Sequence, residues 1–417
     1  MRSWQGLIII MTKSETNLFK KGNRCHVCTG CGRCFGEKQV HTVCEFAYST
    51  EQLGDEGSDT FLVAVDIGTT TIAMQLREMT SGRVIEDFTC INPQCSYGAD
   101  VLSRIAAARD KKPREEMKRQ ILGVLQTGIA RFTGKLSDSK ERIKGMAIAA
   151  NTTMIHLLMG YETEGLGQHP FTPYTVSEIS TKLFDVDTVI LSGVSAFIGA
   201  DVVAGVQALE MQEKEEVTLL VDLGTNGEIV LGNRGGMLAT STAAGPAFEG
   251  GEVYFGTDLI KQVAALLAEG AVDETGLLQE PYFTEGVLAG GVRITQDYIR
   301  QLQMAKSAVC TGIRILCEKY GLKSMEEIAR VYLAGGMGYY LDVEAAVAIG
   351  LLPAVLKEKT VAVGNAALEG AFLYGRDVFL RGGSRKAVPR IKEFNLASQE
   401  QFSAMYISGM DLKPCIE

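Results

Sequence analysis

The sequence predicts an α/β fold in which two related lobes follow a small N-terminal cysteine-rich module. Three observations lead to this prediction. Segments 62–74 and 219–231 share one pattern, an apolar strand that ends in Asp and continues into a turn containing Gly and Thr. Long helical segments follow each copy, and half of the ten cysteines lie within residues 25–44. A chain of 417 residues is long enough for two lobes and such a module.

The second copy of the pattern has the features of a β-hairpin that binds an anion. An apolar run ends in Asp222, and a tight turn and a second strand follow it. The turn consists of Gly224, Thr225, Asn226 and Gly227. Such a turn presents backbone N–H groups and a hydroxyl to phosphate, as anion-binding nests do. The carboxylate at the strand end suits a metal ion or its bound water.

The first copy places the same residue types 156 positions earlier in the chain. Its strand ends in Asp66, and its turn contains Gly68, Thr69, Thr70 and Thr71. A pattern that repeats in register indicates an internally duplicated chain in which each half opens with one phosphate hairpin.

Two other interpretations of the repeat are weaker. Pepsin-like aspartic proteases also carry paired Asp-containing turns, but they need Asp-Thr/Ser-Gly in an almost all-β chain. Here Ile67 and Leu223 hold the middle position, and helical segments follow. Two ordinary hairpin turns are the second alternative, and elements further along the chain argue against it.

The third element is a short apolar strand, 331–334, that runs into a Gly-rich turn. Its glycines are Gly335, Gly336 and Gly338, and a helix is expected from about Tyr339. Glycines there let the backbone approach a flat ligand such as adenosine. Segment 364–371 then begins a helix with small residues, which suits a close helix crossing. These elements, in this order, resemble the actin, sugar-kinase and heat-shock-chaperone superfamily over residues 61–380. The resemblance implies a two-lobed actin-like ATPase that binds Mg–ATP.

Composition narrows the function further. The net charge of −9 argues against a nucleic-acid partner. The longest early apolar run, residues 7–11, is too short for a membrane span or a signal peptide. Met11 is an alternative start, which would place residues 1–10 outside the protein. Ten cysteines without an export signal indicate a reducing cytoplasm, in which metal or redox chemistry is expected rather than disulfides.

The N-terminal cysteines have the spacing of a metal centre. They are Cys25, Cys28, Cys31, Cys34 and Cys44. An unbroken C-x2-C-x2-C run is typical of a loop around a 4Fe–4S cluster, and the segment 28–34 resembles the cluster loop of bacterial ferredoxins. A tetrahedral zinc site, a 2Fe–2S cluster and free thiols are the alternatives.

The identity of the fourth ligand is open. The Cys-Pro that ferredoxins carry at the next position is absent, because residues 36–38 are Gly-Glu-Lys. Either Cys44 or Cys25 completes the set, and Cys44 is preferred because it closes the loop from the far side. His26 and His41 are expected to be surface residues. The remaining cysteines lack ligand spacing and are expected to be core or surface thiols: Cys90, Cys95, Cys310, Cys317 and Cys415.

The chain divides into five expected parts: a module at 1–44, an acidic linker at 45–60, a first lobe at 61–211, a second lobe at 212–380 and a tail at 381–417 without a motif. Within the lobes, strands are expected at 83–89, 145–150 and 237–241. Helices are expected after Asp100, at 113–132, after a cap at Asn151, and at 295–319. His156 and His169 are expected to be structural rather than ligand-binding.

Several motifs together resemble one branch of the superfamily, the reductive activators of corrinoid proteins. They are the two hairpins, Asn92-Pro-Gln, residues 97–104, residues 151–156, residues 244–251 and residues 333–338. Some members also have a longer ferredoxin domain and an extra middle domain, and this chain is expected to lack both.

The resemblance implies ATP-dependent return of cob(II)alamin to cob(I)alamin in the corrinoid protein of a methyltransferase system, with electrons from a low-potential donor. Asp66 and Asp222 would hold magnesium and orient the attacking water. The hairpin turns would bind phosphates, and the three glycines at 335–338 would admit adenosine. The corrinoid partner would approach residues 241–251. The resemblance leaves a homodimer open. The alternatives are a small-molecule kinase, an ATP-dependent activator of a radical dehydratase and a nucleotide-sensing scaffold with zinc.

Overall fold

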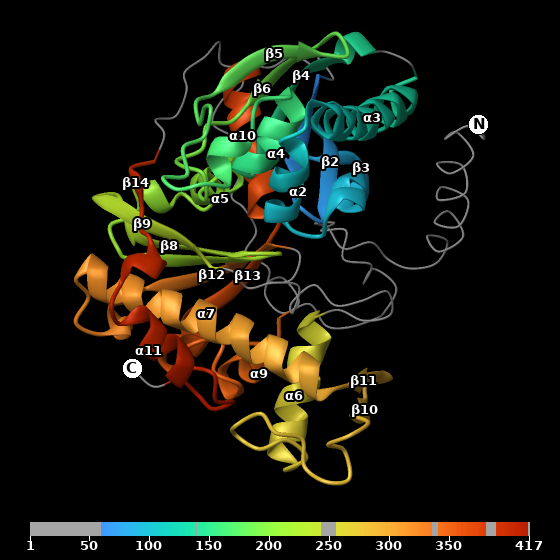
Figure 1. Cartoon of the computed structure of the whole chain (residues 1–417). Helices are drawn as coiled ribbons and strands as arrows, with labels where there is room; N and C mark the ends of the chain where they lie inside the picture. Colours follow the sequence, from blue (N-terminus) through green and yellow to red (C-terminus); the bar gives the residue numbers. More distant parts are fainter. Residues whose placement is uncertain (1–59, 138–139, 243–255, 336–340, 381–388, 416–417) are drawn as a thin grey trace.

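The computed structural model describes residues 60–137, 140–242, 256–335, 341–380 and 389–415 (Figure 1). Within these ranges the chain forms two six-stranded mixed sheets with helices packed on them, which confirms the α/β fold. None of the helices in these ranges has the length and apolar character needed to cross a bilayer.

The first sheet has the strand order β3-β2-β1-β4-β6-β5. Its strands are β1 (Phe61–Ile67), β2 (Thr71–Glu78), β3 (Val84–Ile91), β4 (Ile143–Ala150), β5 (Ile179–Leu183) and β6 (Val186–Ile190). The first three form an antiparallel meander, whereas β4 runs parallel to β1, and β6 runs parallel to β4. The apolar run at the start of β1 is buried throughout, as expected for a central strand covered on both faces.

The second sheet repeats this arrangement, with the order β13-β12-β7-β8-β9-β14. Its strands are β7 (Thr218–Leu223), β8 (Gly227–Asn233), β9 (Gly236–Thr242), β12 (Arg330–Ala334), β13 (Thr360–Gly364) and β14 (Ile391–Glu393). The series β9-β8-β7-β12-β13 matches β3-β2-β1-β4-β6 in order and in direction. The duplication inferred from the sequence is therefore a duplication of sheet topology.

The helices begin where the sequence places capping residues. Asp100 caps α2 (Val101–Ala108), Asn151 caps α4 (Thr152–Met159) and Thr295 caps α7 (Gln296–Tyr320), each by accepting a backbone N–H of the first turn. The helix expected at 113–132 is α3 (Lys111–Lys135). The other α-helices and the small hairpin are α5 (Ala200–Ala208), α6 (Gly256–Ala268), α9 (Val343–Ala348), α10 (Ala366–Leu380), α11 (Phe402–Ser408), β10 (Val287–Ala289) and β11 (Val292–Ile294).

One helix from each half joins the two sheets. α10 follows β13 of the second sheet, yet Leu368 and Phe372 belong to the core of the first sheet, and Figure 1 shows α10 among the elements of that lobe. α5 lies against α10, and its Val202 and Val206 pack with the second sheet. The crossing is close, because a Cβ at Gly370 would lie 2.0 Å from the carbonyl oxygen of Ala204. The expectation of a small-residue helix crossing is confirmed. α10 lies within the sequence range expected for the second lobe but packs on the first sheet.

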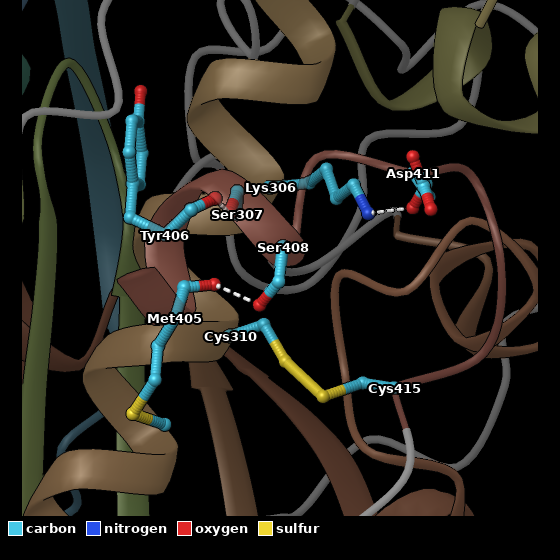
Figure 2. Close-up of a disulfide and its surroundings, with 8 residues drawn as sticks. All are labelled: Lys306, Ser307, Cys310, Met405, Tyr406, Ser408, Asp411 and Cys415. Carbon is cyan, nitrogen blue, oxygen red and sulfur yellow. Dashed lines mark hydrogen bonds between the residues drawn. A yellow bond between two sulfur atoms is a disulfide. The ribbon is translucent and has the colours of Figure 1, made fainter. Parts of the chain in front are cut away.

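The C-terminal segment carries structure that the sequence did not predict. β14 adds to the second sheet beside β9, with Ile391 opposite Met237. α11 then packs along α7, and Leu412 is fully buried in the second core. Lys306, which is buried within α7, donates a hydrogen bond to the carbonyl oxygen of Asp411 (Figure 2). Residues 389–415 are therefore an integral part of the second lobe.

A disulfide joins Cys310 of α7 to Cys415 (Figure 2). The expectation that these two residues are separate thiols, and the expectation that the chain lacks disulfides, are both wrong for this pair. They lie 105 residues apart in sequence and meet because the C-terminal segment folds back over α7. Ligand-type spacing in a sequence cannot reveal such a contact.

We expect the disulfide to stabilise the protein by about 2–4 kcal/mol, because it closes a long loop in the unfolded chain. Cys310→Ser should therefore lower the melting temperature in the absence of reductant, and reductant should lower that of the wild type to a similar value. Cys95→Ser, at an exposed cysteine, is the control and should melt as the wild type does. Alkylation of both Cys310 and Cys415 in folded protein prepared without reductant would contradict the bond.

Candidate functional site

The two hairpin turns meet at one place between the lobes. Both hairpins form as expected, with β1 paired to β2 and β7 paired to β8 in antiparallel register. The hydroxyl oxygens of Thr70 and Thr225 lie 3.1 Å apart, although 155 residues separate them. The turns are closed internally, since Gly68 N donates to Thr71 O and Gly224 N donates to Asn226 O, each at 2.9 Å. The turns of the two hairpins therefore lie in direct contact.

The expected aspartates lie at the ends of the central strands and influence each other. Desolvation by the surrounding protein raises the pKa of Asp66 to about 7, an effect opposed by a hydrogen bond from Asn365. Desolvation likewise raises the pKa of Asp222 to about 7, and the negative charges of Asp201 and Asp66 add to the rise. Because each carboxylate disfavours ionisation of its neighbours, the site is poised to gain from a cation.

Two further carboxylates at this site were not predicted from the sequence. Asp201 lies in the first turn of α5, and desolvation raises its pKa to about 6. Glu228 pairs with Asp222 across the second hairpin and accepts a hydrogen bond from Ser241. Desolvation, followed by the charges of Asp201 and Asp222, raises the pKa of Glu228 well above its usual range. The position of Glu228 in the hairpin register was the available signal, whereas Asp201 enters only through the fold.

The third element contributes Gly335 beside the second aspartate. β12 lies parallel to β7, with Ala334 opposite Asp222. Gly335 follows with φ +83°, and a Cβ there would lie 2.5 Å from Asp222 Oδ1. Only glycine allows the strand to pass the carboxylate at this distance. Gly336 and Gly338, which were expected to act with Gly335, lie outside the described residues.

The arrangement fits a magnesium ion that is shared with a phosphate ligand. Among the described residues, no three His, Cys, Asp or Glu side chains are grouped so that they could hold a metal ion. Mg²⁺ is commonly held by one or two carboxylates and completed by substrate phosphates and water. Asp66 and Asp222, beside two anion-type turns, match that donor set. The residues present therefore fit Mg–ATP better than a free metal centre.

His156 is held by the fold through both of its ring nitrogens. Its side chain is fully buried, its Nδ1 lies 2.7 Å from Thr152 O, and its Nε2 accepts the backbone N–H of Tyr174 at 3.0 Å. Burial lowers its pKa. With both ring nitrogens engaged in the fold, the expected structural role is confirmed. His169 packs edge-on against the ring of Phe171.

The remaining site predictions lie outside the described residues. They concern the cysteines at 25, 28, 31, 34 and 44, the histidines at 26 and 41, and most of the loop proposed to meet the partner, residues 243–251.

Two family models cover nearly all of the described chain. Residues 61–214 match the RACo middle region. Residues 216–265 and 255–415 match the C-terminal domain of RACo, the ASKHA domain. The first match corrects the expectation that the chain lacks a middle domain, because the segment interpreted as the first lobe is itself that region.

Individual relatives agree with the family models. The chain is 29% identical over 413 residues to the corrinoid activation enzyme RamQ of Eubacterium limosum, covering 83% of this chain and 69% of the relative. It is 21% identical over 375 residues to the [Co(II) methylated amine-specific corrinoid protein] reductase of Methanosarcina barkeri, covering 73% and 68%. A solved reductive activator for corrinoid, iron-sulfur protein superposes with a TM-score of 0.74 at 26% identity, covering 87% of this chain and 67% of that one.

We expect the nucleotide-free protein to lose stability as the pH rises. The folded-state pKa values of about 7 for Asp66 and Asp222 exceed the unfolded value of about 3.9, so the folded protein binds more protons between these values. The stability that these groups contribute is present below about pH 4 and is lost as the pH rises through about 7. Asp222→Asn should therefore raise the melting temperature at about pH 8 and change it little at about pH 4.

The matched control for this experiment is Glu400→Gln, which removes an exposed carboxylate far from the hairpins in sequence. It should leave the pH profile of the melting temperature unchanged. Equal profiles for the wild type and Asp222→Asn would show that the pKa of Asp222 is not raised in the folded protein.

Proposed function

Because the chain belongs to the RACo family of corrinoid activators, we propose that it is an ATP-dependent enzyme that reduces the cobalt of a partner corrinoid protein. The specific reaction is the return of cob(II)alamin to cob(I)alamin in a methyltransferase system. The observation that carries this proposal is the convergence of two phosphate-type hairpins and their aspartates in a chain that matches both RACo models.

The nucleotide site is proposed at the meeting point of the hairpins. Asp66 and Asp222 would hold magnesium and orient the attacking water. The phosphates would lie against Gly68, Thr69, Thr70 and Thr71 in the first turn and against Gly224, Thr225, Asn226 and Gly227 in the second. Gly335, Gly336 and Gly338 would admit adenosine. The backbone of Gly335 already passes within van der Waals reach of Asp222, which supports this placement.

When bound, Mg–ATP supplies the free energy for an electron transfer that is uphill for ordinary donors, since 59 mV for one electron is about a tenfold change in equilibrium. The protein can use it only through conformations that differ in affinity for the partner. α5 and α10 are suited to transmit such a difference, because each contacts both sheets.

The N-terminal cysteines are proposed to hold an iron–sulfur cluster, with 4Fe–4S preferred. Cys28, Cys31 and Cys34 would be ligands, and Cys44 is preferred over Cys25 as the fourth. When bound, such a cluster supplies one-electron chemistry between a low-potential donor and the corrinoid. The proposed module at 1–44 and acidic linker at 45–60 would bring it to a partner near residues 241–251. A cytoplasmic location is also part of the proposal, and a homodimer is left open.

We expect anaerobically purified protein to be brown and to contain about four irons per chain, the content of a single 4Fe–4S cluster. Cys31→Ala should lose the iron, whereas Cys95→Ala, at an exposed cysteine outside the module, should retain it. Comparison of Cys25→Ala with Cys44→Ala identifies the fourth ligand. Stoichiometric zinc without iron would refute the redox assignment.

We expect the protein to restore the cob(I)alamin absorption band of a cob(II)alamin-loaded corrinoid protein when it is given a low-potential reductant and Mg–ATP. Asp222→Ala should abolish this reduction while the cluster remains reducible. A chain lacking residues 1–60 should still bind Mg–ATP but fail to reduce cobalt, because the electron path is gone. Equal activity without ATP, or activity of the truncated chain, would contradict the division of labour.

A further inference from the structure

We infer that Asn365 is a positioning residue for the nucleotide site, which ties the start of α10 to the carboxylate of Asp66. Asn365 Nδ2 donates a hydrogen bond to Asp66 Oδ2 at 2.8 Å. Its side-chain oxygen simultaneously accepts the backbone N–H of Leu368 at 2.8 Å and so caps α10. This inference rests on the proposed function, and it assigns a role to a residue that was not among the predicted site residues.

Two other asparagines beside the first hairpin make the same pair of contacts, one to a helix start and one to the hairpin. Asn92 accepts the N–H of Gln94 and donates to Gly68 O at 2.9 Å. Asn151 accepts the N–H of Met154 and donates to Thr69 Oγ1 at 3.1 Å. In each case one amide group begins a helix and also holds one residue of the hairpin. Three helical elements that are distant in sequence therefore fix Asp66, Gly68 and Thr69.

Asparagine is the residue type that can cap a helix and donate a hydrogen bond to the hairpin at the same time. Ser and Asp cap helices as well as Asn does, but an ionised Asp has no donor and Ser has a single short hydroxyl. The carboxamide has an acceptor on one arm and an N–H donor on the other. At position 365 the acceptor serves α10 and the donor serves a carboxylate, where a hydrogen bond to a charged group is stronger than one between neutral groups.

The bond determines how the carboxylate of Asp66 is presented. With Oδ2 held by Asn365, Oδ1 is the oxygen of Asp66 that would be left to bind a metal ion. Groups that orient a metal-binding carboxylate in this way affect metal affinity by about 10–100-fold when they are removed.

The hydrogen bond between Asn365 and Asp66 joins the two halves of the chain. α10 begins directly after β13 of the second sheet but packs on the first sheet and crosses α5. Asp66 is therefore oriented by a residue that enters from the other half of the chain. Any movement of α10 relative to β1 changes the orientation of the Asp66 carboxylate. The geometry of the site therefore depends on the relative position of the two halves.

The test separates the amide contact from the helix cap. Asn365→Ser keeps a capping side chain but loses the donor to Asp66, whereas Asn365→Ala loses both. Thr295→Ala removes an unrelated cap, that of α7. For each variant of the full-length protein we would measure the melting temperature, the Mg²⁺ concentration that gives half-maximal ATP binding, and hydrogen exchange of the amides at residues 67–72 without nucleotide.

We expect Asn365→Ser and Asn365→Ala to raise the Mg²⁺ requirement by a similar factor of about 10–100 and to speed exchange at 67–72. Asn365→Ala should lower the melting temperature more than Asn365→Ser, because it loses the helix cap as well as the hydrogen bond to Asp66. Thr295→Ala should lower the melting temperature but leave the Mg²⁺ requirement unchanged. A wild-type Mg²⁺ requirement in Asn365→Ser would overturn this inference alone. Failure of the wild type to bind Mg–ATP would overturn the proposed function together with it.

Discussion

The architecture depends on the contact between the backbones of Gly370 and Ala204, where α10 and α5 cross. A Cβ at position 370 would lie 2.0 Å from the carbonyl oxygen of Ala204, far inside van der Waals contact, so the helices can approach this closely only with glycine there. Because each helix also packs on a sheet, their separation sets the separation of the sheets. The meeting of the hairpin turns at Thr70 and Thr225 follows from that spacing.

The same crossing concentrates negative charge. Asp201 enters the site on α5, close enough to Asp66 and Asp222 to disfavour their ionisation. A fold that gathers carboxylates in a desolvated space is less stable without a cation than one that disperses them. The cost is consistent with a site built for a ligand rather than for structural stability, since functional sites are where such costs are retained.

Much of the fold was predictable, because its signals are local. The hairpins, the caps at Asp100, Asn151 and Thr295, and the long helices all follow from short-range pattern and capping chemistry. Asp66 and Asp222 were predicted as site residues because they end the strands of a repeated motif, and Gly335 because it lies in a Gly-rich turn after a short apolar strand.

What the sequence left unpredicted depends on long-range contacts. Asp201 and Asn365 lie at the starts of α5 and α10, where no sequence pattern marked them as site residues, and the crossing of these two helices brings them to the hairpins. The pairing of Cys310 with Cys415 depends on a segment that folds back over α7. β14 is too short for its three residues to show a period. Each of these features joins parts of the chain far apart in sequence, which local periodicity cannot report.

β14 has one further consequence, which concerns solubility. β9 is a regular seven-residue strand, and without a neighbour its outer row of N–H and C=O groups would be a template for pairing with another chain. β14 occupies part of that row at residues 237–239 and is itself only three residues long, so little new edge is presented. The C-terminal segment thus shields part of the edge of the second sheet from edge-to-edge association with another chain.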